Sequence, residues 1–166
     1  MDFATDSAAY HVGLWMGTGT ELGRALPTAP SDDPLDADGR ALHLVGVADE
    51  LGMDTYWHAG VPIDAMFSSV RLRARTGLPG GAQLVVALAG ASSSNYYTGQ
   101  INGRPWRAMV LELTSEWRSF DVPFSELRAL GPGEPAPTYD PPWSALHLIS
   151  APNTAYDVWV SQLELR

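Results

Sequence analysis

Short apolar segments separated by turn-forming residues constrain the fold of this chain more than any other feature. The segments are rich in Val, Leu and aromatic residues, and clusters of Gly, Pro, Asp and Ser lie between them. Because no stretch carries the long 3.6-residue apolar period of a helix, the pattern favours an all-β fold over a helical or βαβ fold. We expect strands at His11 to Met16, Ala41 to Val47, Thr55 to Val61, Phe67 to Arg75, Gln83 to Ala89, Arg107 to Leu113, Arg118 to Pro123, Ala145 to Ser150 and Tyr156 to Arg166.

Alternation inside these segments indicates which side chains face the core. In VRLRAR (Val70 to Arg75), apolar residues alternate with arginines, so the apolar residues are expected to face inward and the arginines outward. In the closing segment, Val160 and Leu163 are three residues apart, which breaks the period of two. A β-bulge near Ser161 and Gln162 would reconcile them.

The segments between the expected strands include three long linkers. Loops of this length inside a compact domain are more often functional than idle. Helix is expected at most as a turn over Phe124 to Leu130. The linkers are Pro27 to Gly39, Ala91 to Pro105 and Gly131 to Pro142.

Length and charge limit the classes of function. The 166 residues fit one domain, residues 1–166, with one hydrophobic core. The formal net charge of −9 repels phosphate backbones, so nucleic acid is not an expected partner. Because the chain has no cysteine, it has no disulfide, thiol nucleophile or cysteine metal ligand.

Membrane and targeting segments are not expected in these residues. The apolar run Gln83 to Ala91 is far shorter than the roughly 20 residues that a membrane span needs. The first ten residues lack the basic and apolar regions of a signal peptide. If the protein is secreted, its signal was removed or lies upstream.

Four motifs in a fixed order carry a resemblance to a known family. They are GRALHLVGV (Gly39 to Val47), IDAMFSSVRLRAR (Ile63 to Arg75), EWRSFDVPFSELRAL (Glu116 to Leu130) and SALHLISAPNTAYDVWVSQLEL (Ser144 to Leu165). Together they resemble galactose-binding-like jelly rolls, in particular carbohydrate-binding modules of the family 11 type attached to bacterial polysaccharide-degrading enzymes. The chain departs from these relatives at Ser161 and Gln162, where they usually have acidic residues, and at Leu72, where they have an aromatic one.

The resemblance implies a jelly-roll β-sandwich of two antiparallel sheets. It further implies a non-catalytic domain that binds a polysaccharide or glycan, as part of a larger extracellular or cell-surface protein. It implies core packing for Trp117 and Trp159. No cofactor is required, but the resemblance implies that a structural calcium ion could be held by Asp157 together with an N-terminal carboxylate, Asp2 or Asp6. Ser161 and Gln162 weaken that implication, because acidic ligands are missing there.

One expected loop holds the mixture of side chains that sugar recognition uses. Flat aromatic rings stack on the apolar face of a sugar, while amide and guanidinium groups hydrogen-bond its hydroxyls. The alternative is a solvated loop closed by packing aromatics. The candidate residues are Tyr96, Tyr97, Gln100, Asn102, Arg104 and Trp106.

Tyr56, Trp57 and His58 form a second candidate for the sugar site. On a strand, Tyr56 and His58 share one face and Trp57 lies on the other. The sequence leaves open which of the two faces is the core. An exposed His58 could hydrogen-bond a sugar, although a lone histidine is usually structural.

Carboxylates raise two further possibilities. The acidic loop holds Asp32, Asp33, Asp36 and Asp38, which could bind calcium, although a solvated turn fits the composition better. Hydrolysis of a glycoside would need two carboxylates across a cleft, and the candidates are Glu112, Glu116, Asp121 and Glu126. No spacing places two of them together, so we do not predict an enzyme.

The sequence therefore predicts a sugar-binding module, with one rival. The rival is a structural or protein-interaction β-sandwich with no sugar site, because function depends on the site and not on the fold.

Overall fold

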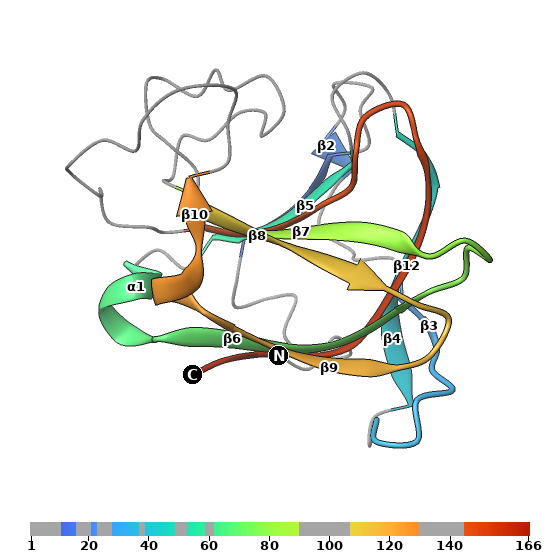
Figure 1. Ribbon diagram of the computed structural model, residues 1–166, viewed down its shortest axis with the longest axis horizontal. Coiled ribbons are helices and arrows are strands. Elements are labelled where there is room, and N and C mark those ends of the chain that lie inside the picture. The colour runs from blue at the N-terminus through green and yellow to red at the C-terminus, as the bar shows by residue number, and fades with distance from the viewer. Residues whose placement is uncertain are drawn as a thin grey trace.

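Two antiparallel β-sheets stack face to face in this protein. The computed structural model describes residues 11–15, 21–22, 28–36, 39–48, 53–58, 62–89, 107–129 and 145–166. In Figure 1 the sheets form an upper layer, with β7 and β8, and a lower layer, with β6 and β9. The all-β prediction and the jelly-roll β-sandwich are confirmed.

The upper layer is a seven-stranded sheet. Every strand pair in it is antiparallel. In spatial order its strands are β10 (Arg128–Ala129), β8 (Arg107–Leu113), β7 (Ala82–Ala89), β11 (Ala145–Ile149), β5 (Asp54–His58), β1 (His11–Trp15) and β2 (Glu21–Leu22).

The lower layer is a five-stranded sheet, also antiparallel throughout. Its strands are, in order, β3 (Thr28–Pro30), β4 (Arg40–Val47), β12 (Ala155–Leu165), β6 (Ser69–Thr76) and β9 (Arg118–Pro123). A short helix, α1 (Ile63–Met66), precedes β6, and a 3-10 turn, η2 (Phe124–Glu126), follows β9.

The core lies between the sheets and is built by alternation. Leu84, Val86 and Leu88 of β7 face residues such as Leu72 and Val160 of the lower sheet, and all are buried. As predicted for VRLRAR, the apolar residues of β6 are buried and its arginines face away from the core. Leu residues supply most of the largest fully buried side chains.

The predicted bulge near Ser161 is confirmed. The pairing of β12 with β6 shifts register between Val160 and Gln162, so that Val160 pairs with Ala74 while Gln162 pairs with Arg73. The extra residue lets Val160 and Leu163 both reach the core, where each is at most 1% exposed.

The predicted strands agree with the structure to within two residues at the ends that it describes. The sequence reading missed β2, β3, β10 and α1, all of which have four residues or fewer and are too short to show a period. β3 falls inside the predicted linker Pro27 to Gly39, whereas the other two linkers lie outside the described residues. The turn predicted after Pro123 is present as η2.

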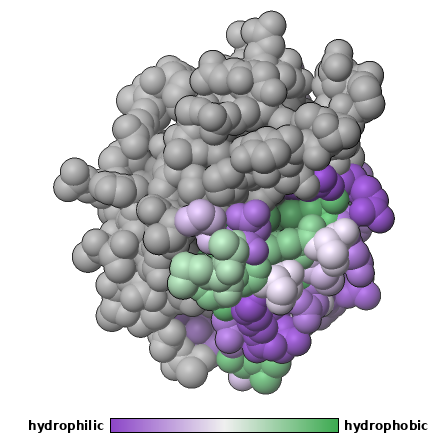
Figure 2. Space-filling view, turned by 90° about the vertical axis from the view of Figure 1, so that its left-hand side faces the viewer, coloured by the Kyte–Doolittle hydropathy of each residue, from purple (hydrophilic) through white to green (hydrophobic). Residues whose placement is uncertain are grey.

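The side of the molecule that carries α1 has a mixed surface. Figure 2 shows apolar and hydrophilic areas adjoining there, and Met66 of α1 is 62% exposed. Within the described residues, no helix is long and apolar enough to cross a membrane.

Candidate functional site

The outer face of the seven-stranded sheet gathers the residues predicted for sugar binding on β5. Register pairs Tyr56 with His147 on one side and with Gly13 on the other. His58 pairs with Ala145 and with His11. Because directly paired residues share a face of the sheet, these residues occupy one face by register.

The same register settles a question that the sequence left open. Trp57 pairs with Leu146, and Leu146 belongs to the core. Trp57 is therefore at a core-facing position, while Tyr56 and His58 are at outer positions. His147 is flanked by two core leucines in β11, so it too is on the outer face, where it is 2% exposed.

The strands before and after the predicted sugar-binding loop, β7 and β8, belong to the same sheet. β7 ends at Ala89, which pairs with Ala145, and β8 begins at Arg107, which pairs with Leu88. Both strands therefore leave the sheet at the end where His58 lies. The loop residues themselves fall outside the described part of the chain: Tyr96, Tyr97, Gln100, Asn102, Arg104 and Trp106.

The acidic loop between β3 and β4 folds against the outer face of the five-stranded sheet. The Asp33 carboxylate is fully buried and accepts two hydrogen bonds of 2.8 Å from the Arg73 guanidinium. Ser161 donates a third hydrogen bond to it. Gln162 donates to the carbonyl of Leu35, at 2.7 Å. Asp33 is thus the anion of a buried ion pair, so the solvated turn favoured by composition is wrong for this residue.

These contacts also lower the pKa of the Asp33 carboxyl. Burial acts to raise the pKa of its carboxyl. The hydrogen bonds from Arg73, from Ser161 and from the backbone N–H of Leu35 outweigh burial, so the pKa lies below its ordinary value of 3.8. Ser161 and Gln162, two of the three residues at which the chain departs from the modules it resembles, therefore both hold the acidic loop in place.

A row of flat groups crosses the same outer face. His43 stacks on Trp159 with ring centroids 3.6 Å apart. The Arg75 guanidinium carbon lies 4.8 Å from the Trp159 ring centroid and 5.2 Å from that of Trp117. The Trp117 indole donates to Asp32 at 2.8 Å.

The positions of Trp117 and Trp159 in this row correct one prediction. Trp117 and Trp159 were expected in the core, but both are half-buried outside it. Val158 and Val160 occupy the inward positions of β12, so alternation places Trp159 on the opposite face. His43 and Arg75 contact Trp159 from the two neighbouring strands, which leaves its ring poorly placed as a sugar platform.

Asp157, a predicted calcium ligand, has partners within the protein. Its Oδ1 accepts a hydrogen bond from the Trp159 indole and lies 2.9 Å from His43 Nε2. Asp2 and Asp6 fall outside the described residues, so calcium binding there stays a prediction. In the described ranges, no three His, Asp or Glu side chains are grouped as a metal site would require.

Two of the four carboxylates considered for hydrolysis lie in different sheets, while Glu116 is in the turn before β9 and Glu126 is in η2. Glu112 is on β8 of the seven-stranded sheet and accepts a hydrogen bond from Gln83. Asp121 is on β9 of the five-stranded sheet and pairs with Arg71. The fold therefore does not bring these two together as a catalytic pair.

Sheet order and antiparallel pairing place the chain in the class of jelly-roll β-sandwiches. Solved structures of carbohydrate-binding modules share this fold. A family 11 module from Clostridium thermocellum, in complex with a β-1,3-1,4-mixed-linked tetrasaccharide, has 13% identity and a TM-score of 0.60, covering 93% of this chain and 88% of that one. A family 30 module of a cellulosomal cellulase from Clostridium thermocellum has 15% identity and a TM-score of 0.59, covering 95% and 91%.

A variant of a family 29 carbohydrate-binding module is a more distant neighbour. Its identity is 9% and its TM-score 0.53, with 93% of this chain and 79% of that chain covered. No protein-family model and no curated protein matches the sequence. At these identities the likeness establishes the fold.

Proposed function

We propose that this domain is a non-catalytic module that binds a polysaccharide or glycan on the outer face of its seven-stranded sheet. The observation that supports the proposal is the register of β5 with β1 and β11, by which Tyr56 and His58 share the outer face; His147 shares that face but is only 2% exposed, so it would act by supporting its neighbours. The fold is that of carbohydrate-binding modules, one of which was solved with a bound tetrasaccharide.

The residue types on this face suit reversible sugar binding. Tyr and His rings offer an apolar face for a sugar ring, and their polar atoms can hydrogen-bond its hydroxyls. The strands that flank the loop with Tyr97 and Trp106 stop at Ala89 and start at Arg107, at the end of the sheet where His58 lies, and we expect both sets of predicted residues to act together. Binding of this kind is weak at each site, and attachment to a larger extracellular protein would raise the effective concentration.

A glycan array tests the proposal. We expect the domain to bind at least one neutral polysaccharide, and we expect Tyr56→Ala and the double variant Tyr97→Ala, Trp106→Ala each to weaken binding about tenfold or more. Val47→Ala is the matched control, because Val47 is 74% exposed on the other sheet. Repeating the array with calcium and with chelator tests the predicted ion.

The outcomes separate the proposal from its rival. Loss of binding in both variants but not in the control would locate the site on this face. Failure of the unmodified domain to bind any polysaccharide would favour a structural or protein-interaction domain, and binding unaffected by the variants would place the site elsewhere.

A further inference from the structure

A pocket of about 710 Å³ opens at the end of the sandwich where three turns meet. The turns are those between β6 and β7, between β8 and β9, and between β11 and β12. They lie at the opposite end of β7 from Ala89, so the pocket is far along the sheet from Tyr56 and His58, although Gln83 and Glu112 are on the same outer face. Seven residue steps of β7 separate the two ends, which corresponds to roughly 23 Å.

The pocket exists because its turns are built from small residues. Gly80, Gly81, Ala82 and Ala151 line it and leave its mouth open. Gly81 has a φ of +81°, a conformation that side chains other than glycine rarely adopt. A Cβ added at Gly80 would meet no atom within 4 Å, so a larger side chain is sterically tolerated there.

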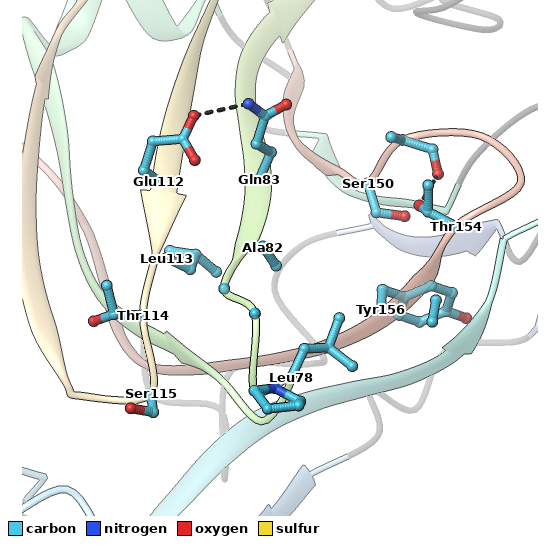
Figure 3. A pocket seen from close by; sticks show the side chains of 15 residues that line it. Leu78, Ala82, Gln83, Glu112, Leu113, Thr114, Ser115, Ser150, Thr154 and Tyr156 are labelled. Carbon is cyan, nitrogen blue, oxygen red and sulfur yellow. Dashed lines mark hydrogen bonds between the residues drawn. The ribbon is translucent and has the colours of Figure 1, made fainter.

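The lining combines an apolar wall with polar groups at the rim (Figure 3). Leu78 and Pro79, in the turn between β6 and β7, supply its accessible apolar surface, whereas Leu113 and Tyr156 line it from the core and are only 2% and 3% exposed. Gln83 and Glu112 are exposed and paired in register, and the Gln83 amide donates to Glu112 Oε1 at 2.8 Å. Within the described residues, Glu112 Oε2 and the Gln83 amide oxygen accept no hydrogen bond, which leaves both available to hydroxyl donors.

Charge indicates which ligands the pocket favours. None of its lining residues, all of them described, is basic, and Glu112 is the charged group. The chain carries a net charge of −9. An acidic ligand would therefore meet repulsion and find no cation, whereas a neutral polyol would meet hydrogen-bond acceptors beside apolar surface.

We propose that this pocket is a second carbohydrate site that takes a single neutral sugar ring, such as the end of a glycan chain. Leu78 and Pro79, the accessible apolar residues of the lining, contact the apolar face of the ring, and the Glu112 carboxylate and Gln83 amide bind adjacent hydroxyls. A volume of this size is typical of small-ligand sites. The inference extends the proposed function, but it depends on different residues and can fail or hold separately.

The test is amide NMR of the full chain with glucose, galactose and mannose, and with glucuronic and galacturonic acids as their acidic counterparts. We expect at least one neutral sugar to shift the amide signals of Gly80, Gly81 and Ser115, and the acids to bind more weakly. Glu112→Gln is expected to weaken binding about tenfold, because a hydrogen bond to a charged acceptor is lost. Gly80→Trp is expected to block the pocket.

Two controls distinguish this site from the proposed face. Glu116→Gln removes a neighbouring exposed carboxylate that does not line the pocket, and it should leave binding unchanged. Tyr56→Ala should weaken polysaccharide binding but leave these amide shifts unchanged.

If no sugar shifts the three signals, or if Glu112→Gln binds as well as the unmodified protein, the inference is wrong. Amide shifts that vanish in Tyr56→Ala would also overturn it, whereas amide shifts without polysaccharide binding would leave the pocket standing and remove the proposed face.

Discussion

Asp33 shows how one residue joins distant parts of this chain. Its carboxylate is buried against Arg73, forty positions away, and against Ser161 near the C-terminus. A buried carboxylate left without its guanidinium, or a guanidinium left without its carboxylate, costs far more than an exposed pair is worth. The Arg73–Asp33 pair is therefore expected to hold the acidic loop on the five-stranded sheet.

Replacing Asp33 tests this at the residue scale. We expect Asp33→Asn to lower the free energy of unfolding by about 3 kcal/mol at neutral pH, measured by urea denaturation. Asp121→Asn is the matched control, because the Arg71–Asp121 pair is 43% and 52% exposed. Its loss should cost less than about 1 kcal/mol. Equal losses in the two variants would show that burial does not govern the strength of the Asp33 pair.

The same residue predicts a dependence on pH. Because the pKa of Asp33 is lower in the folded than in the unfolded protein, its contribution to stability is complete well above pH 3.8 and is lost as the pH falls through the folded-state pKa. The stability difference between the unmodified protein and Asp33→Asn should therefore shrink below about pH 4. A difference that stays constant down to pH 2 would contradict the assigned shift.

At the scale of elements, the bulge in β12 reconciles two demands on one strand. Val158, Val160 and Leu163 must all face the core, while Ser161 must reach Asp33. One extra residue allows both, since Gln162 then resumes pairing with Arg73.

Deletion of Ser161 tests the bulge. Removing it should leave Val160 and Leu163 in strict alternation and preserve the pairing with β6, so the domain should still fold. The expected loss in the free energy of unfolding is about 2 kcal/mol, from the hydrogen bond to Asp33. Deletion of Arg71, in the strictly alternating β6, should be far more damaging, because residues on one side of the deletion must change face. Circular dichroism and urea denaturation of both variants measure this, and equal damage would rule out the bulge as the accommodating feature.

At the scale of the whole molecule, charge predicts how binding responds to salt. The net charge of −9 opposes contact with phosphate backbones, and neutral sugars carry no charge to be screened. We expect the dissociation constant for a neutral polysaccharide to change by less than about twofold between low and high salt. We also expect no retardation of double-stranded DNA at low salt. Strong salt dependence would indicate a charged ligand instead.

Much of the fold could be predicted from the sequence because alternation is a local property. The period of two in VRLRAR and its interruption after Val160 correctly predicted the inward residues of β6 and the bulge in β12. Elements of four residues or fewer, such as β3 and α1, were missed because they are shorter than any period that could reveal them.

The candidate site could be predicted only in part. The residue types of Tyr56 and His58 indicated a sugar site, but the sequence did not show which face of the sheet they occupy. The position of β5 between β1 and β11 assigns them to the outer face. The pocket beside Glu112 gave no local signal, because its small residues come from three turns far apart in the chain.

The sequence by itself thus determined the class of fold, the inward side of the clearest strands and the exclusion of cysteine chemistry. Tertiary structure alone decided which distant residues became partners: Asp33 with Arg73, Trp159 with His43, and Tyr56 with His147. The physical reason is that alternation depends on neighbours along the chain. Pairing between strands depends on strand order and register, which are set by the packing of the whole sandwich.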